Sequence, residues 1–404
     1  MTSTEPKVLE RRSLERKIAV VVGTRPGIIK HSPVIRELAR RGTPFLIIHS
    51  GQHYSPELDA VFFRDLRLPA PDVQLPPMST FTLHGEQTAE MLKGVERALL
   101  ETRPMAIIVG GDANTNLAAT LAARKLNIQV CHDEAGLRSY DWLMPEEHNR
   151  VIMDHVSEFL FAPTEAAAET LSAERVRGRV VVTGSTIVDA VAENLEIAKQ
   201  SSDVIARLDL LPGRYILMTV HHEETVDYRD TLQSVLEGAR RVSELHGLPI
   251  IFPAHPRTRK RLEQFDLLRI VKSPEFRLVE PLGYFDFLVA HSRAALMMTD
   301  SGGAIQEACI LGVACLTLGR VTEWLDTVRV GANLVAGTKA DDIVSASRVM
   351  MGERRDWASP FGPPGVSGRV VDVIEQQVLA GEGFLPPRPN VRVPVDDAPA
   401  VPTG

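Results

Sequence analysis

The sequence has few cysteines and no long apolar run. Its three cysteines, Cys131, Cys309 and Cys315, lie in apolar surroundings, which predicts buried thiols in a reducing compartment. No set of cysteine and histidine residues has the spacing of a zinc site, so no metal site is predicted. No run approaches the roughly 20 apolar residues that span a bilayer, and the first 16 residues are charged and lack the apolar core of a signal peptide. We therefore expect a cytoplasmic protein without a membrane segment.

An excess of positive charge is also missing. The chain has 45 Lys and Arg against 52 Asp and Glu, a formal net charge of −7. This balance argues against a nucleic-acid-binding surface and fits an enzyme. With 404 residues, the chain is longer than a single hydrophobic core usually supports, so we expect two globular domains.

Apolar runs of strand length alternate with amphipathic segments of helix length along most of the chain. This alternation is typical of α/β proteins with doubly wound parallel sheets. We expect two Rossmann-like domains that face each other across a cleft, at 17–187 and 188–366. A C-terminal helix (367–385) and a proline-rich, disordered tail (386–404) follow. The expected strands are 17–22, 45–49, 105–109, a run ending at 131, 159–162, 180–184, 215–220, 249–253, 276–280, 295–299 and 313–318.

Three carboxylates stand in one βαβ unit between Gly110 and Arg150. Asp112 follows one expected strand, Glu134 follows the next, and Glu146 comes shortly after. The carboxyl ends of parallel strands share one edge of the sheet, where ligands bind. Clustered carboxyls separate one another's pKa values and so provide an acid and a base. Alternatively, Asp112 is a helix N-cap and Glu146 is a solvated charge at a helix start.

The first strand leads into Gly23-Thr24-Arg25-Pro26-Gly27 and then into a helix. A glycine turn between strand and helix directs backbone N–H groups at an anion, and Arg25 could fork onto a diphosphate. The turn is not G-x-G-x-x-G, so the dinucleotide fingerprint is absent. The alternative is that Arg25 is a surface arginine at a helix start.

Three loops of the second half carry further candidate residues. His221, after the strand at 215–220, could meet a leaving diphosphate. Alternatively, His221 and His222 form a polar helix start or bind a metal as a pair, although no further ligand is spaced to join them. His255 either lines the cleft or caps a turn. The loop Thr299-Asp300-Ser301-Gly302-Gly303 suits a phosphate at a helix N-terminus, and Glu307 could accept from both ribose hydroxyls. Otherwise, this loop is a glycine-rich turn with an exposed glutamate.

From about residue 17 to residue 337 the chain resembles the non-hydrolysing UDP-N-acetylglucosamine 2-epimerases. The collinear motifs that carry the resemblance are GTRPGIIK, SGQHYSPELD, HDEAGLRS, PEEHNR, VTGSTIVDA, TVHHEE, TDSGG, EACILG and VGANLVAG. The resemblance implies two domains of the glycosyltransferase-B type, a homodimer and no external cofactor. It also implies site residues: Arg25, Ser301, Gly302 and Gly303 for the diphosphate, Glu307 for the ribose, Asp112, Glu134 and Glu146 as acid/base carboxyls, and His221 beside the departing diphosphate.

The implied reaction is epimerisation at carbon 2 of UDP-N-acetylglucosamine, through elimination and re-addition of UDP. Alternatives are a modified UDP-2-acetamido sugar as substrate, a hydrolysing 2-epimerase, a glycosyltransferase on the same scaffold, or a catalytically silent protein that binds a nucleotide sugar. The sequence departs from the family pattern at several positions. Asp133 replaces a small apolar residue, His222 a residue that is commonly Arg, and Trp324-Leu325 an Arg-Pro pair. Strand alternation predicts that Asp133 points away from Glu134.

Overall fold

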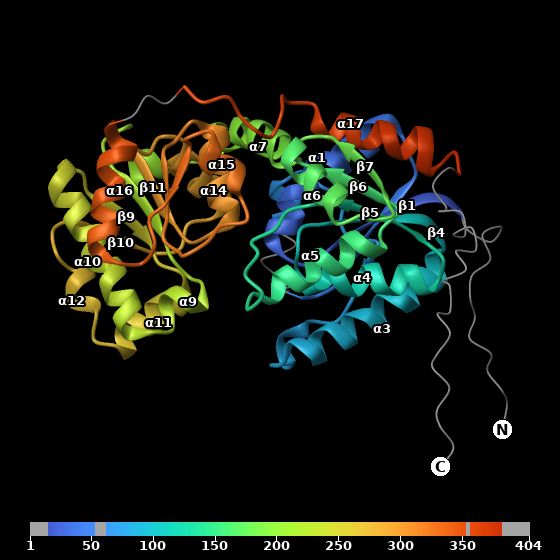
Figure 1. The fold of residues 1–404 in the computed structure, drawn as a ribbon, viewed down its shortest axis with the longest axis horizontal. Helices are drawn as coiled ribbons and strands as arrows, with labels where there is room; N and C mark the ends of the chain where they lie inside the picture. The colour runs from blue at the N-terminus through green and yellow to red at the C-terminus, as the bar shows by residue number, and fades with distance from the viewer. Residues whose placement is uncertain (1–14, 53–61, 353–355, 382–404) are drawn as a thin grey trace, which may run out of the picture.

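The computed structural model describes residues 15–52, 62–352 and 356–381 and contains two all-parallel sheets (Figure 1). The first sheet has seven strands in the order β3-β2-β1-β4-β5-β6-β7, and the second has six in the order β10-β9-β8-β11-β12-β13. The strands of the first are β1 (Glu15–Val22), β2 (Phe45–His49), β3 (Val73–Gln74), β4 (Pro104–Gly110), β5 (Gln129–Asp133), β6 (Phe159–Ala162) and β7 (Arg179–Val182). Those of the second are β8 (Ile216–Thr219), β9 (Ile250–Pro253), β10 (Phe276–Val279), β11 (Leu296–Thr299), β12 (Cys315–Thr317) and β13 (Asn333–Val335).

Helices connect the strands of each sheet. We call the first sheet and its helices the first lobe, and the second sheet and its helices the second lobe; α7 joins them. The helices before α7 are α1 (Arg25–Arg41), the 3-10 turn η2 (Met78–Thr80), α3 (His84–Thr102), α4 (Asn114–Lys125), α5 (Pro145–Val156) and α6 (Glu165–Ala173). From α7 onward they are α7 (Ile187–Ser201), α8 (Val204–Arg207), α9 (Glu223–Val226), α10 (Arg229–His246), α11 (Pro256–Gln264), α12 (Leu268–Val271), α13 (Tyr284–Ser292), α14 (Gly302–Leu311), α15 (Leu325–Arg329), α16 (Ala340–Gly352), α17 (Val366–Val373) and the π-helical turn η3 (Ile374–Val378).

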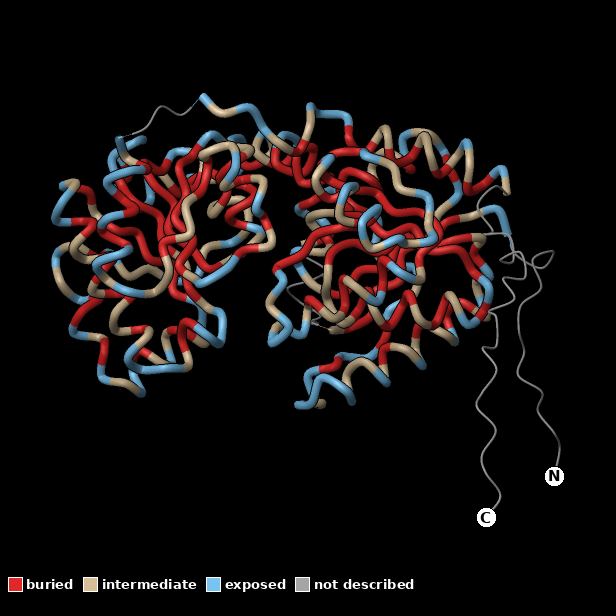
Figure 2. Tube along the Cα trace, in the orientation of Figure 1, coloured by how far each residue is buried: buried red, intermediate tan, exposed pale blue. Residues whose placement is uncertain are grey.

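Strand β1 shows why the first sheet is covered on both faces. Ile18, Val20 and Val22 pack in the cluster that includes α1 and α17, whereas Ala19 and Val21 pack in the cluster that includes α3 and α4. Successive side chains of a strand point to opposite faces, so an unbroken apolar run requires helices on both. Figure 2 shows the resulting buried centre in each lobe. The prediction of two doubly wound, Rossmann-like domains is confirmed.

The chain returns to the first lobe at its C-terminal end. Helix α17 lies beside α1, far from the second sheet that precedes it in sequence (Figure 1). Arg41 donates to Asp372 at 2.6 Å and to Glu375 at 3.0 Å, and Asp189 of α7 accepts from the backbone N–H of Ser367 at 2.8 Å. The first lobe therefore includes both early and late parts of the sequence, and the domain boundaries predicted from sequence stay a prediction.

Some predicted elements differ from those observed. Strand β1 begins at Glu15, two residues before the expected strand at 17–22, and β3 lies between residues 49 and 105, where no strand was expected. Helix α5 begins at Pro145, earlier than the helix after Arg150 that the sequence suggested. A proline at the first helical position is favourable, and Glu146 and Glu147 form the first turn. The predicted disordered tail and His53 and Tyr54 of the GQHY loop lie outside the described residues. Among the helices that are described, none has the length and apolar character to cross a membrane.

Candidate active site

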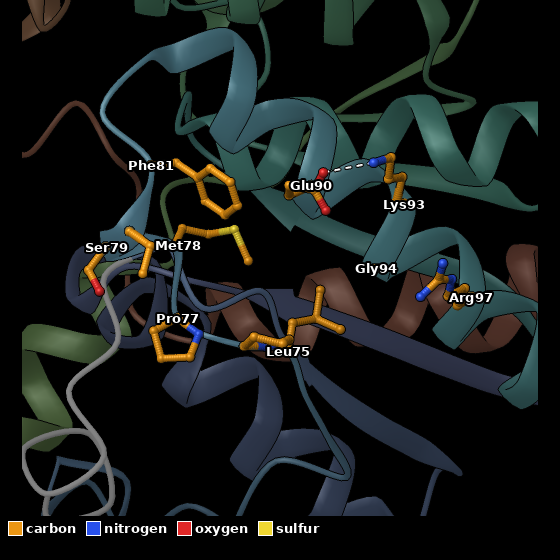
Figure 3. A pocket seen from close by; sticks show the side chains of 11 residues that line it. Leu75, Pro77, Met78, Ser79, Phe81, Glu90, Lys93, Gly94 and Arg97 are labelled. Carbon is orange, nitrogen blue, oxygen red and sulfur yellow. Dashed lines mark hydrogen bonds and ion pairs between the residues drawn. The ribbon is translucent and has the colours of Figure 1, made fainter.

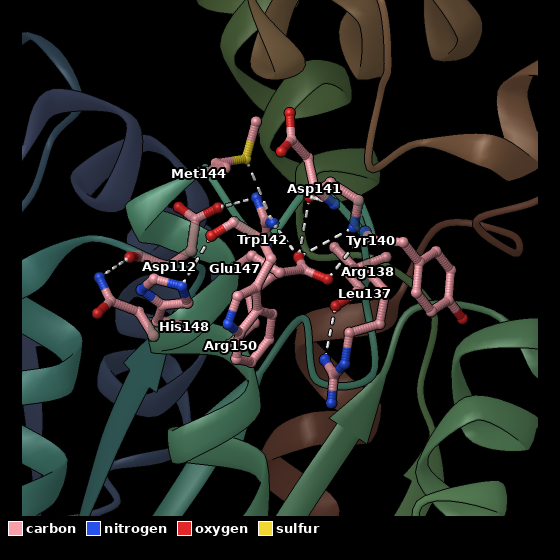
Figure 4. Close-up of polar contacts among 12 residues, drawn as sticks. Asp112, Leu137, Arg138, Tyr140, Asp141, Trp142, Met144, Glu147, His148 and Arg150 are labelled. Carbon is pink, nitrogen blue, oxygen red and sulfur yellow. Dashed lines mark hydrogen bonds and ion pairs between the residues drawn. The ribbon is translucent and has the colours of Figure 1, made fainter.

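Asp112 forms an ion pair with Arg150 at the edge of the first sheet (Figure 4). It follows β4, while Arg150 lies on α5 and is almost fully buried. Burial raises the pKa of Asp112, but the cations of Arg150 and Lys30 outweigh burial and the net pKa is lowered. The carboxyl is therefore ionised at neutral pH, and its side chain keeps 31% of its surface exposed.

Glu134 forms an ion pair with Lys30 beside Asp112. It follows β5, is only 3% exposed, and has a left-handed backbone with φ of 64°. Its other carboxylate oxygen, Oε1, has no hydrogen-bond partner among the described residues. Burial lowers the pKa of Lys30, but the charges of Glu134 and Asp112 outweigh burial and raise it. Lys30 thus lies close to two carboxylates, each of which follows one of the adjacent strands β4 and β5.

Lys30 is the functional candidate that sequence reasoning missed. It lies on α1, at the end of the GTRPGIIK motif, and the motif itself was the available signal. A lysine on an amphipathic helix next to an apolar residue resembles an ordinary surface charge. Only the packing of α1 on β1, which neighbours β4, brings its ammonium group to the two carboxylates.

Glu146 does not join this cluster in the structure. It is half-buried on the first turn of α5, and its side chain makes no polar contact with the described part of the chain. The next residue, Glu147, is buried and accepts from Arg150 at 2.7 Å and from the backbone N–H groups of Ser139 and Tyr140 at 2.9 Å each (Figure 4). Glu147 therefore holds the preceding loop and Arg150 in place, while Glu146 stays free to meet a ligand.

Asp133 and His132, both on β5, bind the backbone next to the two carboxylates Glu134 and Asp112. Asp133 accepts from the backbone N–H of Glu134 at 3.1 Å and from the Thr186 hydroxyl at 2.8 Å. Burial, and secondly the neighbouring charge of Glu134, raise the pKa of Asp133 to about 7. His132 contacts Asp154 at 2.7 Å and the Gly111 carbonyl at 3.2 Å. Asp133 therefore holds the backbone of Glu134, and His132 holds the backbone of Gly111, the residue before Asp112.

His221 and His255 follow adjacent strands at the edge of the second sheet. Asp300, which follows β11, accepts from the backbone N–H of His221 at 2.9 Å and from that of His222 at 3.0 Å. The rings of His221 and His255 lie 5.7 Å apart between centroids. Burial lowers the pKa of His221 to about 4, so its ring is neutral near pH 7.

Ser301, Gly302 and Gly303 form the start of α14. Ser301 is the N-cap, and its side chain makes no capping bond, which leaves the first N–H groups available to an anion. A Cβ atom on Gly302 would lie 2.0 Å from Glu323 Oε1, so a larger residue here would have to displace the Glu323 side chain. Glu307 is buried farther along α14, with Oε2 at 3.6 Å from His291 Nδ1. The predicted phosphate and ribose groups therefore lie on one helix.

The two lobes touch through residues that follow their strands. Thr164, after β6, donates to Asp326 of α15 at 2.7 Å. Burial lowers the pKa of Arg150, but the charges of Asp112 and, across the lobes, of Glu323 outweigh burial and raise it. Gln306 of α14 donates to Ser185 at 2.6 Å, immediately before α7. The carboxylate cluster and the start of α14 thus belong to lobes that touch at their carboxyl edges. Arg25 is exposed at the start of α1, and its side chain has no polar partner within the ranges that the structure covers.

A hollow of about 600 Å³ lies elsewhere, between residues 75–81 and α3 (Figure 3). Leu75, Met78 and Phe81 form its apolar side, and the Glu90–Lys93 ion pair lies on its rim. None of the predicted site residues lines it. We therefore place the site at the sheet edges and not in this hollow.

The chain is similar to known epimerases over most of its length. It is 44% identical to UDP-N-acetylglucosamine 2-epimerase of Methanocaldococcus jannaschii, over 89% of this chain and 98% of that protein. It is 34% identical to UDP-2,3-diacetamido-2,3-dideoxy-D-glucuronate 2-epimerase of Pseudomonas aeruginosa, over 89% of this chain and 99% of that protein. The crystal structure of the M. jannaschii enzyme in complex with UDP-GlcNAc and UDP superposes with a TM-score of 0.83 at 43% identity, covering 89% of this chain and 99% of that one. Residues 36–375 match the family described as UDP-N-acetylglucosamine 2-epimerase, and the chain belongs to this family.

Proposed function

We propose that this protein epimerises UDP-N-acetylglucosamine at carbon 2 to UDP-N-acetylmannosamine. The observation that carries the proposal is the pair of carboxylates, Asp112 and Glu134, which share Lys30 at the edge that meets the second lobe. Its support from relatives is the 44% identity to an enzyme of that name. The residue roles below are part of the proposal.

The reaction begins with removal of a proton from carbon 2. One carboxylate takes this proton while the bond between carbon 1 and the UDP oxygen breaks, so a carbon–carbon double bond forms between carbons 1 and 2. UDP then adds back to carbon 1 as a proton returns to the opposite face of carbon 2. One proton leaves and one returns, and UDP leaves and re-adds, so the steps balance without an oxidant or an external cofactor.

Cations around the first-lobe carboxylates keep a base available at neutral pH. Arg150 and Lys30 stabilise the ionised form of Asp112, and Lys30 pairs with Glu134. Glu134 is buried, and a carboxylate held away from water needs little solvent reorganisation when it accepts a proton. Glu146, on the first turn of α5 and without a polar partner among the residues that the structure describes, is the third acid/base candidate.

Groups of the second lobe receive the leaving UDP. The N–H groups at the start of α14, from Gly302 and Gly303, face the developing diphosphate charge, and the helix dipole adds to their effect. His221 and His255 donate to the diphosphate from the neighbouring loops, and Glu307 accepts from the ribose hydroxyls. Arg25 adds a cation from α1 of the first lobe. Stabilising the departing charge lowers the barrier to elimination.

The test follows the sugar by proton NMR in heavy water with UDP-N-acetylglucosamine as substrate. Deuterium at carbon 2 and the appearance of UDP-N-acetylmannosamine are the expected results. Release of free N-acetylmannosamine would indicate a hydrolysing enzyme instead. Exchange with a modified UDP-2-acetamido sugar, but not with UDP-N-acetylglucosamine, would assign a different substrate. Absence of exchange with both would overturn the proposal.

We also propose a homodimer located in the cytoplasm. The resemblance to a homodimeric family supports the dimer. The buried free cysteines, Cys131, Cys309 and Cys315, support a reducing location such as the cytoplasm. Light scattering at several protein concentrations tests the dimer: a mass near 44.4 kDa at all of them would rule it out. Fractionation of the producing cells tests the location.

A further inference from the structure

Two histidines and an aspartate gather at the carboxyl edge of the second sheet. His221, His222 and Asp300 each offer one ligand atom, and these atoms all lie within 4.8 Å of one another. His221 follows β8 and Asp300 follows β11, two adjacent strands in which Thr219 is in register with Thr299. The sheet therefore supplies the third ligand, 78 residues after His222, that the sequence did not provide beside the histidine pair.

The donor set suits a borderline transition-metal cation. Zn²⁺ takes imidazole nitrogen and carboxylate oxygen in a tetrahedral arrangement, with bonds of about 2.1 Å. Two ligands at that bond length are then about 3.4 Å apart. The Nδ1 atom of His221 lies 3.4 Å from Oδ1 of Asp300, so this pair already has the separation that the cation requires.

The carboxylate is oriented before any cation arrives. Backbone N–H groups of His221 and His222 hold Asp300 at 2.9 and 3.0 Å, and Asp300 is only 8% exposed. Hydrogen bonds of this kind orient a ligand without using all of its lone pairs. The carboxylate therefore keeps acceptor capacity for an ion.

The second histidine is free to complete the site. The His222 ring is exposed, lies 4.8 Å from the His221 ring between centroids, and makes no hydrogen bond to the described residues. It can turn toward Asp300 without disturbing the core. The charge of Arg257 acts on His221, but Arg257 is paired with Asp227 at 2.6 Å and with Glu223 at 3.0 Å, which reduces its repulsion of an ion. A fourth position stays open to water or to a phosphate oxygen.

We propose that His221, His222 and Asp300 form a binding site for a divalent transition-metal cation, best matched by Zn²⁺, whose occupancy inhibits the enzyme. The inhibition follows because the cation takes the His221 nitrogen that otherwise meets the diphosphate. This second part rests on the proposed function; the binding does not. Mg²⁺ prefers an all-oxygen, octahedral set and does not substitute for Zn²⁺ here.

The binding experiment uses the full-length protein and needs no turnover. Zn²⁺ is titrated by calorimetry, and Co²⁺ is titrated while its visible absorption is recorded. We expect one cation per chain, with a Co²⁺ spectrum of nitrogen and oxygen ligation. His222→Ala and His222→Arg should each weaken binding by at least about tenfold, since loss of a direct ligand costs no less than loss of a supporting group. His155→Ala, which removes an exposed histidine of the first lobe, is the matched control and should bind like the wild type.

Inhibition is measured separately. Micromolar Zn²⁺ should lower wild-type turnover, a chelator should restore it, and the two His222 variants should keep their own turnover in the same Zn²⁺ concentration. Equal Zn²⁺ affinity in wild type and both His222 variants, or no binding in the wild type, would overturn the site. Binding at the site with unchanged turnover would overturn the inhibitory role alone. An inactive enzyme that still binds Zn²⁺ through His222 would remove the proposed function and leave the site standing.

Discussion

Asp133 of β5 accepts a 2.8 Å hydrogen bond from Thr186, the residue that precedes α7. The same carboxylate accepts the backbone N–H of Glu134, whose φ is 64°. The adjacent Ser185 accepts from Gln306 of α14 in the second lobe. A buried acid therefore ties the backbone of a catalytic candidate to the segment that joins the lobes.

Replacing this acid should change how stability depends on pH. The pKa of Asp133 rises from 3.8 to about 7 on folding, chiefly through burial. Between these values the folded state holds a proton that the unfolded state has lost, so the residue destabilises the fold increasingly as pH rises toward 7. We expect the free energy of unfolding of Asp133→Asn, minus that of wild type, to increase by more than about 1 kcal/mol from pH 5 to pH 8. Urea unfolding at both pH values measures this difference, and a difference that is flat or falls with pH would contradict the assignment.

Removing either of the paired carboxylates should stop most of the chemistry. Asp112→Asn and Glu134→Gln should each lower turnover by roughly two to four orders of magnitude, the range for lost acid/base groups. The measurement is the rate of deuterium incorporation at carbon 2. Glu196→Gln, an exposed carboxylate on α7 that pairs with Lys199, serves as control and should leave the rate unchanged. Near-wild-type rates in both site variants would remove the cluster from the mechanism.

Substitution of the two neighbouring glutamates of α5 should have different effects, one on turnover and the other on stability. Glu146→Gln should lower turnover by about two to four orders of magnitude with little change in melting temperature, because its side chain has no polar partner in the described part of the chain. Glu147→Gln should destabilise the fold by about 3 kcal/mol or more, because it leaves the buried Arg150 with one carboxylate fewer. Thermal melting and turnover are measured on both. A stable, active Glu146 variant would show that this residue is only part of the helix start.

Lys30 should set the pH at which the carboxylates work. Lys30→Met keeps the length of the side chain but removes the cation that faces Asp112 and Glu134, so the pKa of Asp112 should rise. We expect the acidic limb of the pH–rate profile to move to higher pH, with lower turnover at pH 7. Lys30→Arg keeps the charge and should leave the limb near its original position. A Met variant with an unshifted limb would show that Lys30 acts only in packing.

Glu307 should report on nucleotide binding. It is buried on α14, beyond the glycines at the helix start. Glu307→Gln should weaken UDP binding by about tenfold or more, because an amide cannot accept both ribose hydroxyls as a carboxylate can. Calorimetry with UDP measures this, and Glu280→Gln, an exposed carboxylate paired with Arg259, is the control. Unchanged affinity would count against the ribose role.

Much of the fold follows from local patterns in the sequence. The predicted bounds of β2 and β6 agree with the structure, because an apolar run of strand length carries its own signal. The positions of Asp112 and Glu134 at one edge also follow, since a βαβ unit has one handedness and brings the ends of adjacent parallel strands together. Strands β3 and β13 have two and three residues, too few for a periodic pattern, and were missed.

The sequence by itself determined the α/β class, the two sheets, the residue types at the strand ends and, through its motifs, the family. Only the tertiary structure decided which of these groups touch: Lys30 with Glu134, Glu147 rather than Glu146 with Arg150, Asp133 with Thr186, and Asp300 with the histidine pair. The physical reason is range. Periodicity and strand length are local properties of the chain, whereas most of these contacts join residues on different elements and are set by the packing of helices on the sheets. Glu147 and Arg150 are three residues apart on one helix, and the packing of α5 decides that this face is buried.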